Sequence, residues 1–153
     1  MAGCESGRER VGLATVMPMR VRPREHVAVL AAATPVHAGF PSPAQDYFDG
    51  AIDLNEHLIG DPVATFLVRV AGDSMIGAGI ADGDEVIVDR SLDPGDGSVV
   101  IAVVDGELTI KRLRLTGHGP ELHPENPAYP VIRVGSAAEL VIWGVVTRCL
   151  HRL

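Results

Sequence analysis

Lysine occurs once in this chain, at Lys111, whereas arginine occurs twelve times. Arginine keeps its charge in proteins, but a buried lysine can lose its proton because desolvation disfavours the ammonium form. Lys111 ends the run Leu108-Thr109-Ile110-Lys111, where a strand could bury it. A neutral amine at this position could act as a general base. The alternative is a surface lysine on an exposed strand, which is the common case because lysine is seldom buried.

Ser74 is the matching candidate nucleophile. It lies in Ala71-Gly72-Asp73-Ser74-Met75, directly after an apolar strand predicted to end at Val70. Glycines around a serine allow main-chain N–H groups to approach an oxyanion without obstruction, and we take the N–H groups of Ser74 and Met75 as the oxyanion-hole candidates. The alternative is an ordinary turn rich in glycine and aspartate.

A serine with a lysine base is a known variant of the Ser-His-Asp arrangement and needs no histidine. The six histidines form no metal-binding or triad-like pattern. His118 and His123, five residues apart, are interpreted as surface residues, with a metal pair as the alternative. No metal or cofactor is therefore expected.

Charge is divided unevenly along the 153 residues. Residues 1–38 carry five arginines and three acids, whereas residues 39–153 carry eight basic and 17 acidic residues. Nucleic-acid phosphates would repel the acidic residues 39–153, so direct sequence-specific DNA binding is not expected.

Cys4 and Cys149 form no disulfide framework and fit a reducing cytoplasm. No apolar run is long enough to cross a membrane, although residues 20–38 partly resemble a secretion signal with a short apolar core.

The sequence predicts β structure for the elements that must position Ser74 and Lys111. Short runs rich in Val, Ile, Leu and Thr alternate with turn signals, and Asp105-Gly106 predicts a two-residue hairpin. The expected strands are residues 65–70, 85–89, 98–104, 107–115 and 139–147. The class is mainly β, a compact fold of short antiparallel strands that is partly barrel-like.

Residues 1–38 are expected to form a flexible arm, in which 27–33 is a strand or part of a helix. Residues 52–59 are expected to form one or two helical turns with Asp53 as the cap.

Linked motifs in one order resemble a known family. Gly72-Asp73-Ser74-Met75 followed by Gly79-Ile80-Ala81-Asp82-Gly83-Asp84 resembles the nucleophile segment of LexA/UmuD-type self-cleaving peptidases. Residues 104–113 resemble the lysine strand of that family, and Lys111 lies 37 residues after Ser74. Residues 38–47 resemble its cut site, and 52–55, 125–129 and 144–146 are similar too. The resemblance covers about residues 36–150.

The resemblance implies a cut between Ala38 and Gly39, which would remove residues 1–38 from a peptidase and dimerisation domain, 39–153. Ser74 would attack the Ala38 carbonyl after Lys111 removes its proton. Ala-Gly matches LexA repressors rather than the Cys-Gly expected in UmuD. Thirty-eight residues with three internal prolines are too short for a DNA-binding helix-turn-helix domain, which favours the UmuD-like branch.

The family also implies partners and a setting. A RecA filament on single-stranded DNA would trigger cleavage, and the trimmed homodimer would serve a Y-family, UmuC-like translesion polymerase in the SOS response. Two alternatives remain open. One is a non-catalytic polymerase-binding module, and the other is an exported or signal-peptidase-like protein.

Overall fold

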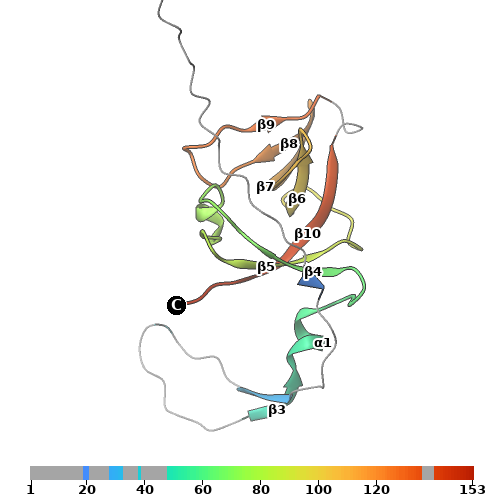
Figure 1. The fold of residues 1–153 in the computed structure, drawn as a ribbon, viewed down its shortest axis with the longest axis vertical. Helices are drawn as coiled ribbons and strands as arrows, with labels where there is room; N and C mark the ends of the chain where they lie inside the picture. Colours follow the sequence, from blue (N-terminus) through green and yellow to red (C-terminus); the bar gives the residue numbers. More distant parts are fainter. Residues whose placement is uncertain (1–18, 21–27, 33–37, 39–47, 136–139) are drawn as a thin grey trace, which may run out of the picture.

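The computed structural model describes residues 19–20, 28–32, 38, 48–135 and 140–153. Strands dominate these residues, with one short α-helix and one 3-10 turn (Figure 1). The elements are β1 (Met19–Arg20), β2 (Ala28–Ala32), β3 (Phe48–Asp53), α1 (Leu54–Leu58), β4 (Thr65–Arg69), η1 (Ile76–Ala78), β5 (Glu85–Asp89), β6 (Val99–Val104), β7 (Glu107–Thr116), β8 (Gly119–His123), β9 (Ile132–Arg133) and β10 (Val141–Leu150).

Eight strands form one sheet in the order β1-β4-β5-β10-β6-β7-β8-β9, and every neighbouring pair is antiparallel. The predicted mainly β class of short antiparallel strands is confirmed. Within the described part of the chain, β1 and β9 are the two edges, so the sheet remains open. All five expected strands are present, whereas β1, β3, β8 and β9 were not predicted.

The β6–β7 hairpin carries Lys111 and turns where the sequence predicted. Asp105 and Gly106 have φ angles of 52° and 80°, as a type I′ turn requires at its two central residues. The register pairs Val104 with Glu107 next to the turn and Val100 with Lys111 further along. The turn therefore fixes which residues of β7 face the interior.

Strand β10 joins the two halves of the sheet. It pairs with β6 through Val141–Val145 and with β5 through Val145–Leu150, and its register shifts once in each half. A Cβ at Gly144, at the first shift, would lie 2.6 Å from a methyl carbon of Val88. A glycine is needed there because the two strands approach so closely.

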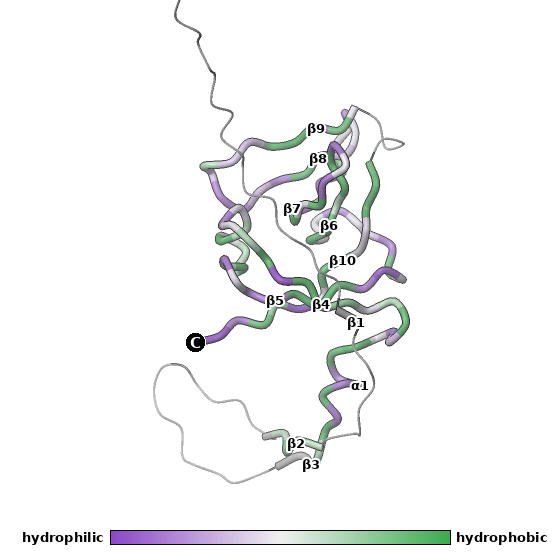
Figure 2. The backbone as a smooth tube through the Cα atoms, in the orientation of Figure 1, coloured by the Kyte–Doolittle hydropathy of each residue, from purple (hydrophilic) through white to green (hydrophobic). Residues whose placement is uncertain are grey.

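Two clusters of buried side chains form the core, and both consist almost wholly of aliphatic residues. The strands that carry them are coloured largely as hydrophobic in Figure 2. The first contains Val68, Val70, Met75, Ile80, Val86, Val88, Ile101 and Ile110, and the second contains Val100, Ala102, Leu113 and Leu122. Met75 is only 1% exposed, so the residue after Ser74 anchors the candidate nucleophile segment in the core.

Strands β2 and β3 and helix α1 lie together at one end of the molecule, away from β7 (Figure 1). Residues 28–32, predicted as strand or helix, form strand β2, which pairs with β3. Helix α1 follows at once, and Asp53 caps it by accepting a hydrogen bond from the Asn55 N–H at 2.8 Å, as predicted. No helix in the described residues is long and apolar enough to cross a membrane.

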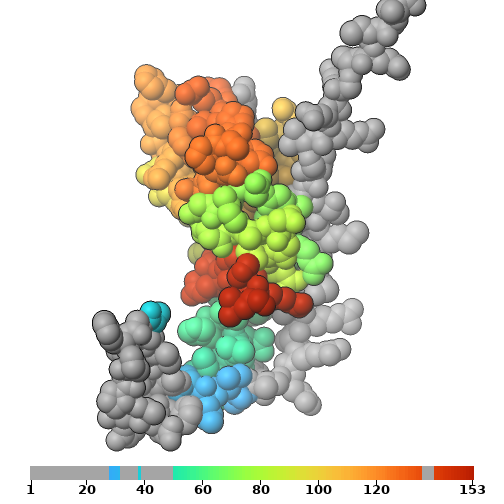
Figure 3. All heavy atoms as spheres, turned by 90° about the vertical axis from the view of Figure 1, so that its left-hand side faces the viewer, coloured from blue at the N-terminus to red at the C-terminus, as the bar shows by residue number. Residues whose placement is uncertain are grey.

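The C-terminal end lies against the loop that follows the nucleophile segment (Figure 3). The His151 ring nitrogen Nδ1 lies 2.6 Å from Asp84 Oδ1, and the second Asp84 oxygen accepts from the Ala81 N–H at 2.8 Å. These hydrogen bonds lower the pKa of Asp84 below its usual value. The carboxylate therefore stays charged and ties the last residues to the loop.

Candidate active site

The segment that carries Ser74 is held at both ends. At its start, the Val70 N–H donates to the Asp84 carbonyl at 2.8 Å, and the Gly83 N–H donates back to Val70 at 2.9 Å. The Gly72 N–H donates to Asp82 Oδ1 at 2.6 Å. At its end, Met75 is buried in the core. The half-buried Ser74 thus stands on a fixed turn between a strand and a 3-10 turn.

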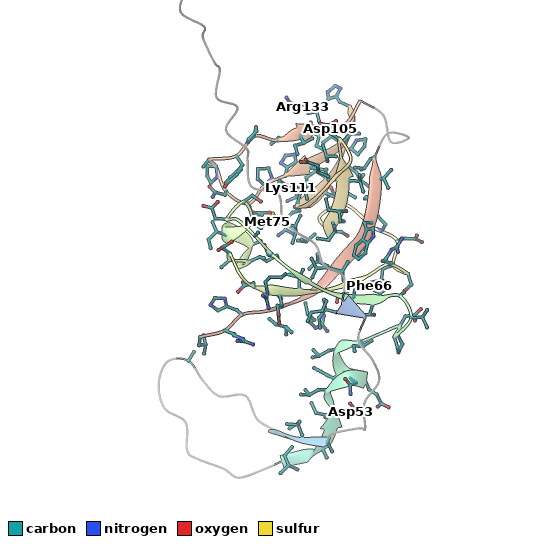
Figure 4. All side chains as sticks on the ribbon, in the orientation of Figure 1. Asp53, Phe66, Met75, Asp105, Lys111 and Arg133 are labelled. Atoms are coloured by element: carbon teal, nitrogen blue, oxygen red, sulfur yellow. The ribbon has the colours of Figure 1, made fainter. Side chains whose placement is uncertain are left out.

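Lys111 reaches this turn from β7 (Figure 4). Its Nζ lies 2.9 Å from Ser74 Oγ, 2.9 Å from the Ile110 carbonyl oxygen and 3.1 Å from Thr109 Oγ1. All three partners are uncharged, and no described acidic side chain forms an ion pair with Lys111. The structure therefore brings together the two candidate residues that lie 37 positions apart in the sequence.

Burial changes the chemistry of this lysine. Lys111 is 7% exposed, and burial lowers the pKa of its amine below the usual lysine value. Desolvation acts in this direction because it penalises the charged form of the amine. The alternative interpretation of Lys111 as an exposed surface lysine is therefore wrong.

An open groove of about 440 Å³ runs past the two residues. Its walls come from the nucleophile segment, from the β6–β7 hairpin and from the stretch before and within β9. The lining residues are Ala71, Gly72, Asp73, Ser74, Val104, Asp105, Glu107, Leu108, Thr109, Ile110, Lys111, Tyr129, Pro130 and Ile132. An extended peptide laid in this groove would pass both Ser74 Oγ and Lys111 Nζ.

A short stretch, residues 125–129, clamps the main chain around Ser74. The Glu125 N–H donates to the Ser74 carbonyl at 2.8 Å, and the Gly77 N–H donates to the Glu125 carbonyl at 2.7 Å. Asn126 donates through Nδ2 to the Asp73 carbonyl at 3.0 Å, and the Tyr129 hydroxyl donates to Asp73 Oδ1. We call residues 125–129 the clamp segment.

Strand β7 supports the clamp segment as well as the lysine. Arg112, next to Lys111, forms an ion pair with Glu125 and donates to the Gly97 carbonyl at 2.7 Å. Neighbouring side chains of a strand point to opposite faces. Strand β7 therefore has two roles. Lys111 points from one face toward Ser74, and Arg112 points from the other face and holds the clamp segment.

The N–H groups of Ser74 and Met75 are available for a ligand. Neither donates a hydrogen bond to any described residue, whereas the N–H groups of Ile76, Ala78 and Gly79 in the following turn all do. Two adjacent unpaired N–H groups beside a serine hydroxyl can stabilise a negatively charged oxygen.

The predicted cut site is not at Ser74 in this structure. Ala38 is an exposed bend and is not one of the described residues that line the groove, and Gly39 lies outside the described residues. Of the two histidines considered as a metal pair, His118 is exposed in the β7–β8 turn, and His123 lies 2.7 Å from Glu121. Sequence reasoning assigned no role to Thr109, Arg112 or the clamp segment, although residues 125–129 had been noted for their resemblance alone.

Comparison with known proteins places this geometry in a family. Residues 31–147 match the family model described as Peptidase S24-like. The chain belongs to the Peptidase S24-like family. Together with the individual relatives, this match confirms the predicted relationship to UmuD-like members of the LexA/UmuD family.

Individual relatives of this peptidase agree with that assignment. Protein SamA of Salmonella typhimurium is 49% identical over 115 residues, which cover 75% of this chain and 79% of that protein. Protein MucA of Escherichia coli is 46% identical over 116 residues, with 75% and 79% covered. The LexA repressor of Delftia acidovorans is 42% identical over 110 residues, which cover 72% of this chain but only 49% of the repressor.

Proposed function

We propose that this S24-like peptidase cuts its own chain between Ala38 and Gly39, with Ser74 as the nucleophile and Lys111 as the general base. The observation that carries the proposal is the 2.9 Å separation of Lys111 Nζ and Ser74 Oγ, in a site where the amine is buried among uncharged groups. The family assignment supports a serine peptidase of the LexA/UmuD type.

The hydrogen bonds around the amine suit a neutral lysine. A neutral amine has two N–H donors and one lone pair, whereas an ammonium group has three donors and no acceptor. Thr109 Oγ1 and the Ile110 carbonyl can accept the two N–H bonds. The lone pair then points toward Ser74, whose hydroxyl can donate to it. This is the arrangement that a general base needs before it takes a proton.

The reaction then proceeds in two stages. Lys111 takes the Ser74 proton while Oγ bonds to the Ala38 carbonyl carbon, and the carbonyl oxygen becomes negative beside the N–H groups of Ser74 and Met75. The bond to the Gly39 nitrogen breaks, and the ammonium of Lys111 donates its proton to the leaving amine. Water, deprotonated by the same lysine, releases Ala38 from Ser74 and restores the hydroxyl.

Cleavage requires Ala38 to move into the groove. Strand β2, before the cut, pairs with β3, after it, and Ala38 stands exposed outside the groove. An extended arm pairing through its main chain would bring the bond to Ser74. A partner that shifts this equilibrium from 1:99 to 99:1 must bind the cleavable state more tightly by about 5.5 kcal/mol.

The proposed biological setting is the one that the resemblance to the LexA/UmuD family implies. We assign the trigger to a RecA filament on single-stranded DNA, and we assign the trimmed homodimer to a Y-family, UmuC-like polymerase in the cytoplasmic SOS response. Residues 1–38 would be the arm that is removed, and 39–153 the peptidase and dimerisation domain. The match to a LexA repressor, named in one relative, supports this setting.

The test is intact mass spectrometry of the full-length protein and of Ser74→Ala. Both are incubated at raised pH and, separately, with RecA, single-stranded DNA and a nucleotide. We expect a fragment that begins at Gly39 from the wild type and none from Ser74→Ala. A Gly39 fragment from Ser74→Ala would exclude Ser74 as the nucleophile. An uncut wild type under both conditions would favour a non-catalytic polymerase-binding module.

The rate of cleavage should depend on pH through Lys111. Only the neutral amine accepts the proton, so the rate should rise about tenfold per pH unit below the lysine pKa and level off above it. Because burial lowers that pKa, the plateau should begin below the usual lysine value. A single-turnover rate profile from pH 6 to 10 checks this, and a flat profile would contradict it.

A further inference from the structure

Lys111 shares its groove with three carboxylates, Asp73, Asp105 and Glu107. An opposite charge within about 4–6 Å of a lysine stabilises the ammonium form. The lysine can serve as a base only if these carboxylates stay away from it. In the described structure none of them forms an ion pair with Lys111.

The three carboxylates are all exposed but differ in position. Asp105 and Glu107 lie at the tip of the hairpin, where the type I′ turn fixes the main chain. Asp73 directly precedes Ser74 in the segment that touches the lysine. Val100 pairs with Lys111 across β6, and the described hydrogen-bond partners that its own strand gives the amine, Thr109 and Ile110, are uncharged. Asp73 is therefore the carboxylate whose orientation matters most.

A hydrogen bond from the clamp segment fixes that orientation. The Tyr129 hydroxyl donates to Asp73 Oδ1, and Asn126 holds the Asp73 carbonyl at 3.0 Å. Tyr129 is half-buried and lines the same groove. The bond to the carboxylate raises the pKa of Tyr129, so the hydroxyl keeps the proton that it donates to Asp73.

We infer that Tyr129 is a positioning residue that holds the Asp73 carboxylate away from Lys111 and so preserves the neutral amine. The inference rests on the proposed function, in which Lys111 is the base. Without the Tyr129 hydroxyl, the Asp73 side chain would be free to turn along the groove toward the lysine ammonium. The resulting ion pair would favour the protonated lysine.

The single lysine makes a direct test possible. Full-length protein labelled with 13C at lysine Cε gives one lysine signal, whose chemical shift against pH reports the Lys111 pKa. The Ser74→Ala background prevents cleavage during the titration. In that background we expect Tyr129→Phe to raise the Lys111 pKa by about one unit. Adding Asp73→Asn to Tyr129→Phe should return it to the starting value.

Cleavage of the Ser74-containing proteins gives the second readout. Tyr129→Phe should cleave about tenfold more slowly near neutral pH and recover at high pH, because one pKa unit changes the neutral fraction tenfold. Asn126→Ala is the matched control, since it loosens the Asp73 carbonyl without freeing the carboxylate. It should lower the rate equally at all pH values and leave the Lys111 pKa unchanged.

The results separate this inference from the proposed function. An unshifted Lys111 pKa in Tyr129→Phe, or a shift that Asp73→Asn does not reverse, would overturn the role of Tyr129. A wild type that never cleaves would instead refute the proposed function, and the lysine titration would still decide whether Tyr129 shields the amine from Asp73.

Discussion

Lys111→Arg should abolish self-cleavage at every pH although it keeps the positive charge. A guanidinium does not lose its proton in proteins, so it cannot take the proton of Ser74. Loss of a general base typically slows a reaction by about 10² to 10⁴-fold. Intact mass spectrometry at pH 7 and pH 10, with the wild type alongside, measures the effect. Cleavage by Lys111→Arg at a rate near that of the wild type would exclude the lysine as the base.

Lys111→Met supplies the control for folding. Methionine has a similar length to the lysine stem and carries no amine to desolvate, so it suits a side chain that is 7% exposed. Burying a polar amine costs desolvation free energy, and an apolar side chain of similar volume avoids that cost. We expect Lys111→Met to unfold at the same temperature as the wild type or higher, and still not to cleave. Loss of cleavage with stability retained would separate the chemistry of Lys111 from any structural role.

The sequence was most informative where side-chain type and turn chemistry agree. Strands β4, β5, β6 and β7 follow runs of β-branched and aliphatic residues, and the Asp105-Gly106 turn fixes the register that points Lys111 inward. The strand β8 was missed because Gly119 and Pro120 begin it, and both residues usually indicate a turn. Here Pro120 pairs with Leu115 and is buried, so tertiary packing overrides the local signal.

For the candidate site too, the sequence indicated the two reacting residues but not the contacts that hold them in place. Taken alone, Lys111 is more often read as a surface lysine and Ser74 as part of an ordinary turn. The resemblance of their linked segments to LexA/UmuD-type peptidases is what singled out the pair. Their contact depends on the sheet order β4-β5-β10-β6-β7, which brings the C-terminal strand between the elements that carry them. The clamp segment has no regular structure, so its role depends on hydrogen bonds across the fold. No local pattern predicts such contacts.

Gly77→Ala should be the most damaging change that leaves both Ser74 and Lys111 in place. The Gly77 N–H donates to the Glu125 carbonyl, whose oxygen would lie only 2.5 Å from a Cβ at position 77. The obstacle is main chain, so no side-chain rotation relieves it. The clamp segment would have to move away, and Ser74 would lose the hydrogen bond from Glu125 to its carbonyl. A displacement of about 1 Å at a reacting group can cost 10²-fold in rate, and we expect a loss of that size.

Gly117→Ala is the matched control for this change. Gly117 is exposed in the β7–β8 turn, and a Cβ there meets no atom within 4 Å. Both variants lose the same backbone freedom in the unfolded chain, so the difference between them isolates the contact with Glu125. Single-turnover cleavage and thermal unfolding of the two proteins give the comparison. If Gly77→Ala cleaves as fast as Gly117→Ala, the clamp segment does not position Ser74. If Gly77→Ala alone is slow while its Lys111 pKa stays lowered, placement of the serine, rather than the proton affinity of the base, limits the reaction.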